Sequence, residues 1–240
     1  MDMSHSDNLK IGAIILCRMD SSRLPGKVLF KLKSKPMLEH IIDRLLKVNA
    51  LTDSCIVATT SREVDKCIVD FIKQNKQSSI FRGEADNVAN RVIECAKEYN
   101  LDYFFRINAD SPFIEPQLLE QACNIAYKKK YDFITNLYPR SFPYGVSIEL
   151  IKTSFYQSIY SEIAAEYEQE HVTAYLYKNM SNINYYNIKK EGENWSQVRL
   201  VVDDEGDYLK LSKLVNALPK EFCDITYQEA INNIKENGVF

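Results

Sequence analysis

The 240-residue chain lacks the features that mark several common classes of protein. It has three histidines, and none of its six cysteines forms a C-x-x-C pair, which argues against a zinc site and indicates free, mostly buried thiols. Its net charge is -3, so no basic excess indicates nucleic acid as a partner. No apolar run is long enough to span a bilayer, and the first ten residues have no signal-peptide core. We therefore expect a cytoplasmic protein with no membrane partner.

Motifs that would indicate other kinds of active site are also missing. There is no G-x-G-x-x-G, and Gly26-Lys27 is followed by Val28, so neither a dinucleotide-binding nor a Walker loop is present. No nucleophile elbow accompanies His40 or His171, which leaves a Ser-His-Asp triad without support. Without a linker, repeat or low-complexity segment, the chain is expected to form one domain over residues 1–240.

The first half of the sequence shows a regular alternation of strand and helix patterns. Short apolar runs predict buried strands at 10–17, 54–60, 78–83, 102–110 and 131–136. Amphipathic segments predict helices at 36–48, 62–75, 86–99 and 116–130. This order predicts a three-layer α/β fold, a mostly parallel sheet with helices on both faces. Ligands in such folds bind at the carboxyl ends of the strands.

The rhythm changes after residue 136. We expect a strand of different orientation at 145–151, a largely helical stretch at 155–179, strands at 182–190 and 198–204, and closing helices at 207–218 and 225–238.

A cationic loop, CRMDSSRLPGK at 17–27, follows the first predicted strand. Arg18, Arg23 and Lys27 can neutralise a polyphosphate, and Ser21 and Ser22 can add hydrogen bonds to its oxygens. An ordinary solvated loop is the alternative, but three cations at the carboxyl end of a strand favour a phosphate site. We expect Lys27 to be exposed and to contribute little to stability.

Two aspartates, Asp110 in NADSPFI and Asp203 in VVDDEGD, each follow an apolar run that predicts a strand. A parallel arrangement would bring both carboxylates to one edge of the sheet, where they could hold Mg²⁺ together with phosphate oxygens. The alternative is that each caps a helix or favours its dipole, and the residues alone leave both readings open. His171, alone in a helical stretch, indicates no function by itself.

Taken together, these stretches resemble the cytidylyltransferase family that includes the synthetases of CMP-Kdo and CMP-acylneuraminate, and especially its spore coat polysaccharide biosynthesis protein F branch. The loop at 17–27 resembles the family opening Q-A-R-x-x-S-x-R-L-P-G-K from Arg18 onward. Five further segments resemble family motifs: FRGEADNVANR, INADSPFI, PRSFPYGVSIEL, EHVTAYLY and VVDDEGDYLKL. The resemblance covers about residues 11–210.

This resemblance implies a nucleotide-diphospho-sugar transferase-like fold and transfer of CMP from CTP to a sugar or sugar-acid hydroxyl, with Mg²⁺ and release of pyrophosphate. By position, Arg18 and Lys27 would contact the triphosphate and, with Asp110, act in catalysis. Asp110 and Asp203 would hold the metal. Arg82 and Gly83 would lie beside the nucleoside.

The same resemblance assigns an acceptor side to Arg140, Tyr144, Glu149 and His171. Tyr144 and Ser147 stand where the branch has aspartates, which leaves the identity of the acceptor open. Residues 138–190 are expected to form a homodimer contact, because aromatic residues are enriched at interfaces. The tyrosines in question are Tyr175, Tyr177, Tyr185 and Tyr186. They could instead pack on their own sheet.

Two other functions stay open at this point. A metal-dependent glycosyltransferase would share the fold but would have little use for the cationic loop. A non-catalytic nucleotide-binding relative would have no reason to keep both aspartates beside that loop.

Overall fold

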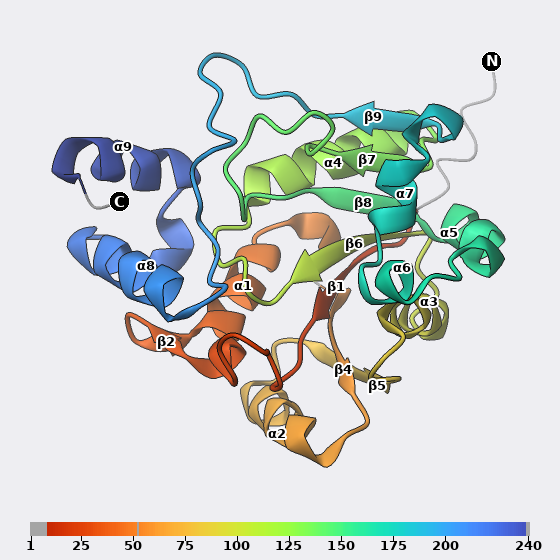
Figure 1. The fold of residues 1–240 in the computed structure, drawn as a ribbon, viewed down its shortest axis with the longest axis horizontal. Coiled ribbons are helices and arrows are strands. Elements are labelled where there is room, and N and C mark those ends of the chain that lie inside the picture. Colours follow the sequence, from red (N-terminus) through yellow and green to blue (C-terminus); the bar gives the residue numbers. More distant parts are fainter. Residues whose placement is uncertain (1–8, 52, 239–240) are drawn as a thin grey trace.

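The computed structural model describes residues 9–51 and 53–238 (Figure 1). The N-terminal stretch in which we expect no signal sequence falls mostly in residues 1–8, outside the described part. In the described ranges, no helix is both long enough and apolar enough to cross a bilayer. No disulfide joins the described cysteines, and four of the six are buried, as their scattered spacing predicts.

A sheet of seven described strands forms the middle layer, in the order β5-β4-β1-β6-β8-β7-β9. These strands are β1 (Ile11–Leu16), β4 (Cys55–Thr60), β5 (Ser79–Gly83), β6 (Tyr103–Asn108), β7 (Phe133–Thr135), β8 (Glu149–Lys152) and β9 (Tyr185–Asn187). A separate hairpin, β2 (Lys31–Leu32) with β3 (Lys35–Pro36), was not predicted. β1 pairs parallel with both β4 and β6, whereas β8 runs antiparallel between β6 and β7. The change of strand orientation after residue 136 is therefore confirmed.

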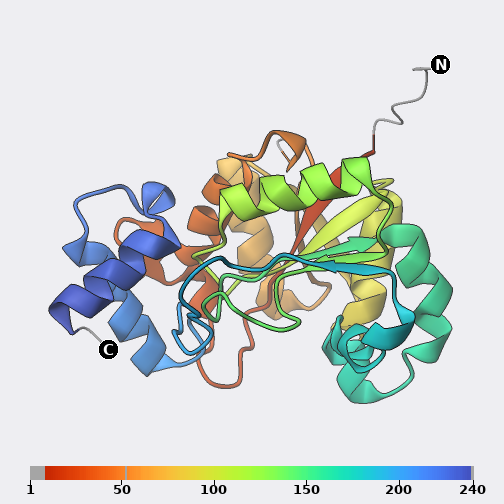
Figure 2. The ribbon, with the colours of Figure 1, turned by 90° about the horizontal axis from the view of Figure 1, so that it is seen from above.

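The helices of the described ranges form the outer layers. They are α1 (Met37–Leu45), α2 (Lys66–Asn75), α3 (Val88–Glu98), α4 (Pro116–Lys128), α5 (Thr153–Ile159), α6 (Glu166–Glu170), α7 (Ala174–Lys178), α8 (Glu205–Ala217) and α9 (Tyr227–Asn237). Short 3₁₀ turns lie at Lys27–Leu29, Asn49–Leu51, Glu63–Asp65, Tyr160–Glu162, Met180–Asn182 and Phe222–Asp224. Seen from above, α4 covers one side of the sheet, and α3 lies on the other (Figure 2).

Each face of the sheet carries its own hydrophobic core because side chains alternate along a strand. Ile15 of β1 packs toward α1, α4, α8 and α9 on one face. Its neighbour Ile14 packs toward α3, α5 and α7 on the other face, and both are fully buried. Burial on both faces explains why β1 reads as a continuous apolar run. The predicted three-layer α/β architecture is confirmed.

The prediction of a strand over residues 198–204 is wrong. This segment has a single β-bridge, from Arg199 to Tyr144, and otherwise runs extended beside the loop at 141–146. Gly145 allows the close approach, since its φ is 99° and a Cβ there would lie 2.4 Å from the Leu200 oxygen. Farther on, the Val202 N–H donates to the Asp110 oxygen at 2.9 Å. The segment thus reaches the carboxyl edge of β6 without joining the sheet.

Candidate functional site

A cavity of about 490 Å³ opens at the carboxyl ends of β1 and β6. Nine residues of the predicted site line it: Arg18, Ser21, Ser22, Arg23, Lys27, Asp110, Tyr144, His171 and Asp203. The loop, the two aspartates and the EHVT segment, far apart in the sequence, are therefore brought together. Parallel strands explain why the loop and Asp110 meet, because the carboxyl ends of β1 and β6 share one edge of the sheet.

Lys27, Asp110 and Asp203 form the floor of this cavity. The Lys27 ammonium donates to Asp110 Oδ2 at 2.9 Å and to the Val202 oxygen at 2.8 Å, and Asp203 Oδ1 lies 3.7 Å away. Only 10% of the Lys27 side chain is exposed, so the expectation of an exposed lysine is wrong. The loop closes where the Gly26 N–H donates to the Met19 oxygen at 2.7 Å, with Gly26 in the left-handed region. That turn leads into the 3₁₀ turn that begins at Lys27, and the lysine side chain is buried there.

Neither aspartate of the floor caps a helix, so the capping alternative is wrong for both. The residue at the N-cap of α4 is Glu115. At α8 the cap is Asp204, whose carboxylate accepts from the Asp207 N–H at 2.9 Å. Asp203, one residue earlier, instead accepts from Arg23 at 3.0 Å and from Arg199 at 2.9 Å. Its carboxylate thus belongs to the cavity.

Arg18, Arg23, Glu170 and His171 form the rim of the cavity. Arg18 Nη2 donates to Glu170 Oε1 at 3.1 Å, which ties the cationic loop to α6. Arg23, paired with Asp203, keeps 62% of its side chain exposed. The His171 ring is exposed and packs against Tyr167, with 4.4 Å between the ring centroids. The rim therefore presents paired but accessible charges.

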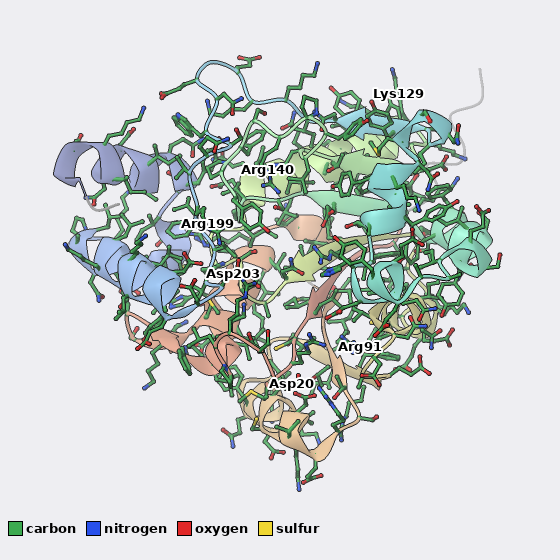
Figure 3. All side chains as sticks on the ribbon, viewed as in Figure 1. Asp20, Arg91, Lys129, Arg140, Arg199 and Asp203 are labelled. Atoms are coloured by element: carbon green, nitrogen blue, oxygen red, sulfur yellow. The ribbon has the colours of Figure 1, made fainter. Side chains whose placement is uncertain are left out.

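Four residues of the predicted site do not line this cavity: Arg82, Gly83, Arg140 and Glu149. The Arg82 guanidinium donates to the backbone oxygens of Thr60 and Arg62, each at 3.1 Å. Arg140, labelled in Figure 3, has its guanidinium 4.7 Å from the centroid of the Tyr144 ring. Glu149 is buried behind the lining, where it accepts from Arg106 at 3.0 Å and from the Tyr177 hydroxyl at 2.9 Å. Arg140 and Glu149 thus contact the cavity through neighbours.

Three charged residues of the lining were missed from the sequence. Arg91 ends the FRGEADNVANR segment, so its place in that motif was the available signal. Arg106 interrupts the apolar run of β6, and a charge inside a buried strand could also have been noticed. Glu170, next to His171, carried no signal of its own because α6 is rich in acids.

Burial shifts the pKa of several groups around the cavity. It lowers the pKa of Arg91 to about 10, so this guanidinium is still charged at neutral pH. It also lowers the pKa of Arg140. Burial, together with the nearby Glu149 carboxylate, raises the pKa of Tyr177 well above its usual value. Tyr177 of α7 is thus a neutral group that forms hydrogen bonds with Thr135 and Glu149 of the sheet.

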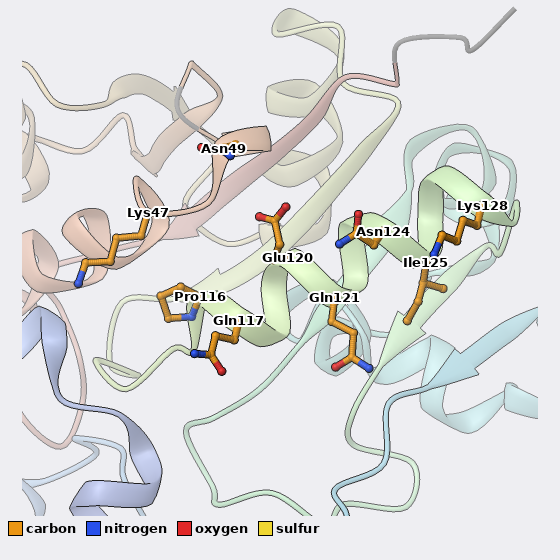
Figure 4. A pocket seen from close by; sticks show the side chains of 9 residues that line it. All are labelled: Lys47, Asn49, Pro116, Gln117, Glu120, Gln121, Asn124, Ile125 and Lys128. Atoms are coloured by element: carbon orange, nitrogen blue, oxygen red, sulfur yellow. The ribbon is translucent and has the colours of Figure 1, made fainter.

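A second, larger hollow of about 630 Å³ lies elsewhere, along α4 and the turn after α1 (Figure 4). Its lining consists of Lys47, Asn49, Pro116, Gln117, Glu120, Gln121, Asn124, Ile125 and Lys128. None of these residues belongs to the predicted site. The cavity at the carboxyl edge is therefore the candidate active site, although this hollow and another of about 900 Å³ are both larger.

Comparison with known proteins identifies the family. The family profile described as Cytidylyltransferase matches residues 12–235. The chain belongs to the cytidylyltransferase family.

Relatives of this family align over nearly the whole chain. The uncharacterised protein MJ1063 of Methanocaldococcus jannaschii is 30% identical, covering 95% of this chain and 96% of its own length. The spore coat polysaccharide biosynthesis protein SpsF of Bacillus subtilis is 28% identical, covering 93% of each chain. A solved cytidylyltransferase from Leptospira borgpetersenii has a TM-score of 0.90 at 28% identity, covering 96% of this chain and 95% of its own. The resemblance read from the motifs is confirmed.

Proposed function

We propose that the protein transfers CMP from CTP to the hydroxyl of a sugar, sugar acid or related acceptor and releases pyrophosphate. Such a product would serve in the synthesis of surface polysaccharide or glycoconjugate precursors. The observation that carries the proposal is the floor of the cavity, where one buried ammonium lies between two carboxylates at the end of a cationic loop. Membership of the cytidylyltransferase family supports CTP as the donor.

The charges of the floor and rim suit a triphosphate. Lys27, Arg18 and Arg23 approach the cavity from one loop, and their positive charges can offset those of phosphate oxygens. In the reaction, the acceptor oxygen forms a bond to the α-phosphorus while the bond from that phosphorus to the bridging oxygen breaks. Pyrophosphate leaves with the electron pair. Fixed cations that stabilise the departing charge and hold the reactants in line would supply most of the catalysis.

The proton of the acceptor hydroxyl needs a recipient. The cavity lining offers the carboxylates of Asp203 and Glu170 and the imidazole of His171. An acceptor that is already ionised, such as a phosphate or phosphonate, would need no base. We assign Tyr144, which has Arg140 and Arg199 each stacked on its ring, to the acceptor side.

The floor fits the Mg²⁺ that the family resemblance implies. Asp110 and Asp203 direct hard oxygen donors toward one point, now occupied by the Lys27 ammonium. Within the described residues, no cluster of three or more acids, histidines or cysteines could enclose a metal by itself. Two carboxylates suit a Mg²⁺ ion that also binds phosphate oxygens and water. When bound, the ion would offset negative charge on the phosphates.

Pyrophosphate release tests this proposal against its rivals. The purified protein is incubated with Mg²⁺, with CTP or a nucleotide-sugar donor, and with candidate sugar acids. A cytidylyltransferase releases pyrophosphate from CTP only when an acceptor is present. A glycosyltransferase would consume the nucleotide sugar instead, and a non-catalytic relative would bind CTP and release nothing.

The homodimer stays a separate proposal. Tyr177 of α7 packs against its own sheet, whereas Tyr186 of β9 is exposed and could contact a second copy. Light scattering at micromolar concentration should give twice the mass of one 27.8 kDa chain. A mass of one chain would end this proposal. A cytoplasmic location likewise stays an expectation from the sequence, and cell fractionation would test it.

A further inference from the structure

Asp65 is the most deeply buried acid of the described ranges, and the proposed reaction has no step for it. Its surface is 0% exposed, and it does not line the candidate active site. The residue ends the 3₁₀ turn after β4 and stands at the N-cap position of α2. An aspartate there would ordinarily accept a hydrogen bond from an N–H of the helix, yet its side chain forms no such cap. Its carboxylate therefore serves another contact.

That contact is with the cationic loop of the cavity. Asp65 Oδ1 accepts from the Met19 N–H at 2.7 Å, although the two residues are 46 positions apart in the sequence. The Met19 oxygen accepts from the Gly26 N–H, also at 2.7 Å, which closes the loop just before Lys27. Both backbone polar groups of Met19 are thus engaged. Because Met19 directly follows Arg18, its position affects where the loop places both Arg18 and Lys27.

A second contact from the same segment holds the next residue of the loop. Arg62 Nη1 lies 2.6 Å from Asp20 Oδ2, and Arg62 Nη2 lies 3.6 Å from Asp65 Oδ2. Asp20 Oδ1 in turn lies 3.6 Å from Arg18 Nε. Thr60, at the end of β4, donates its hydroxyl to Asp65. The segment after β4 therefore fixes both the backbone and a side chain of the loop.

Arg82 supports this segment from the neighbouring strand β5. Its guanidinium donates to the backbone oxygens of Thr60 and Arg62, which belong to the segment. The Ser61 N–H donates to the Gly83 oxygen at 3.0 Å. A continuous set of contacts thus runs from β5 through the segment to the cationic loop. It gives Arg82 a place in the architecture of the site, although this residue does not line the cavity.

We propose that Asp65 is a positioning residue, which holds the Met19 peptide and thereby keeps Arg18 and Lys27 in the arrangement that receives a triphosphate. This inference rests on the proposed function, because it assumes that the loop binds CTP. A loop that is ordered before the ligand arrives loses less conformational freedom on binding, so it binds more tightly. A loop released from Asp65 would have to become ordered on binding, and its affinity for CTP would fall.

Hydrogen exchange of the loop tests the contact without any ligand. In the wild-type protein the Met19 N–H donates to a buried carboxylate, so it should exchange slowly. Asp65→Ala removes the acceptor, and exchange in the peptide 17–27 should accelerate by about tenfold or more, as the loss of a hydrogen bond to a charged group predicts. Strand β6 is the internal reference and should change little. Asp65→Asn keeps an oxygen at the same place and should keep most of the protection.

Calorimetry with CTP then tests the consequence for binding, at a temperature where circular dichroism shows each variant to be folded. Asp65→Ala should bind CTP about tenfold more weakly than the wild type, and Asp65→Asn within about threefold of it. Asp70→Asn is the matched control, because it removes an acid from the exposed side of α2 and should leave the affinity unchanged. Should Asp65→Ala fail to fold, Asp65→Ser, whose hydroxyl ends one bond short of the carboxylate oxygens, replaces it with the same expectation.

A double-mutant cycle separates positioning from a general effect on the fold. If Asp65 acts through the loop, then in an Arg18→Ala background the tenfold loss caused by Asp65→Ala should shrink to about threefold or less, because the two changes affect one unit. An equal loss in both backgrounds would show that Asp65 does not act through Arg18 and would overturn the inference.

The remaining outcomes distinguish this inference from the proposed function. Wild-type protein that binds no CTP would contradict the proposed function, and the inference with it. Normal CTP binding by the wild type, with loop exchange that is unchanged in Asp65→Ala, would overturn only the contact with Met19. Faster loop exchange with an unchanged affinity for CTP would confirm that contact but overturn the positioning role.

Discussion

The floor and the rim of the cavity take their cations from the same loop, yet burial gives them different properties. Lys27 of the floor is enclosed by Asp110, Asp203 and a backbone oxygen. Arg23 of the rim, four residues earlier, is mostly exposed. In the sequence the two residues are equivalent basic positions of one motif. The comparison shows that fold stability should depend on the floor, whereas the rim should act mainly on ligand affinity.

The largest expected effect comes from the carboxylates of the floor. Asp110→Asn and Asp203→Asn should each lower turnover about a hundredfold or more, because each removes a charge needed for several kcal/mol of electrostatic stabilisation. The double variant should be scarcely worse than either single one, since groups that act as a unit are not additive. Asp204→Asn is the matched control, as asparagine also caps a helix. The rate of pyrophosphate release is measured for all four variants. Normal turnover by Asp203→Asn at saturating Mg²⁺ would remove that residue from the site.

Lys27→Ala should have the next largest effect, and it should lower both the stability of the fold and the affinity for CTP. Without the ammonium, the two half-buried carboxylates of the floor lose their shared cation, so the free energy of unfolding should fall by roughly 2 kcal/mol. Affinity for CTP should fall about tenfold to a hundredfold with the lost phosphate contact. Urea unfolding and calorimetry measure the two effects. Unchanged stability would show that the distinction between floor and rim has no energetic meaning.

The pH dependence of stability gives a second comparison of a buried group, His40, with an exposed one, His171. Burial lowers the pKa of His40, whose Nε2 donates to the Leu32 oxygen at 2.7 Å. The unfolded chain therefore binds a proton more readily than the folded protein. Stability should be fully present above about pH 6.5 and should decrease as the pH falls toward the lower folded pKa.

The test compares His40→Gln with His171→Gln in urea unfolding between pH 7 and pH 5. The first variant should lose the part of the pH slope that comes from His40, and the second, on the exposed rim, should keep it. Loss of the slope in the His171 variant would assign the pH dependence to the rim and contradict the prediction.

The smallest expected change in stability belongs to the rim. Arg23→Ala should alter the free energy of unfolding by less than about 1 kcal/mol, because an exposed ion pair contributes little. CTP binding should weaken, and the loss should shrink as salt is raised, since exposed charges are screened. Thermal unfolding and salt-dependent calorimetry would check this. A loss of stability as large as that of Lys27→Ala would contradict the comparison.

Local chemistry made much of the molecule predictable. Continuous apolar runs predicted β1, β4 and β6 because parallel strands are buried on both faces, and alternation with amphipathic helices predicted the layers. Once those strands are parallel, the loop at 17–27 and Asp110 must share an edge. Asp203 was expected at the same edge because the apolar run before it predicted a strand. The structure does bring it to the floor, but through a segment that does not join the sheet.

Other features arise only from contacts between distant segments. The apolar run at 198–202 looks like a strand, but its hydrogen-bonding groups pair with the loop at 141–146 and with Asp110 instead of a neighbouring strand. Arg82 and Arg91 stand in one motif, yet the first turns to the backbone oxygens of Thr60 and Arg62 while the second enters the cavity.

The sequence by itself determined the strand and helix alternation, the site edge and the family, because periodicity and motif are local properties of the chain. Only the tertiary structure decided that Lys27 is buried, that Asp204 and not Asp203 caps α8, and that Arg91 lines the cavity. The physical reason is that burial and pairing depend on which distant groups surround a side chain. The sequence alone does not distinguish a lysine beside Asp110 from a lysine in water.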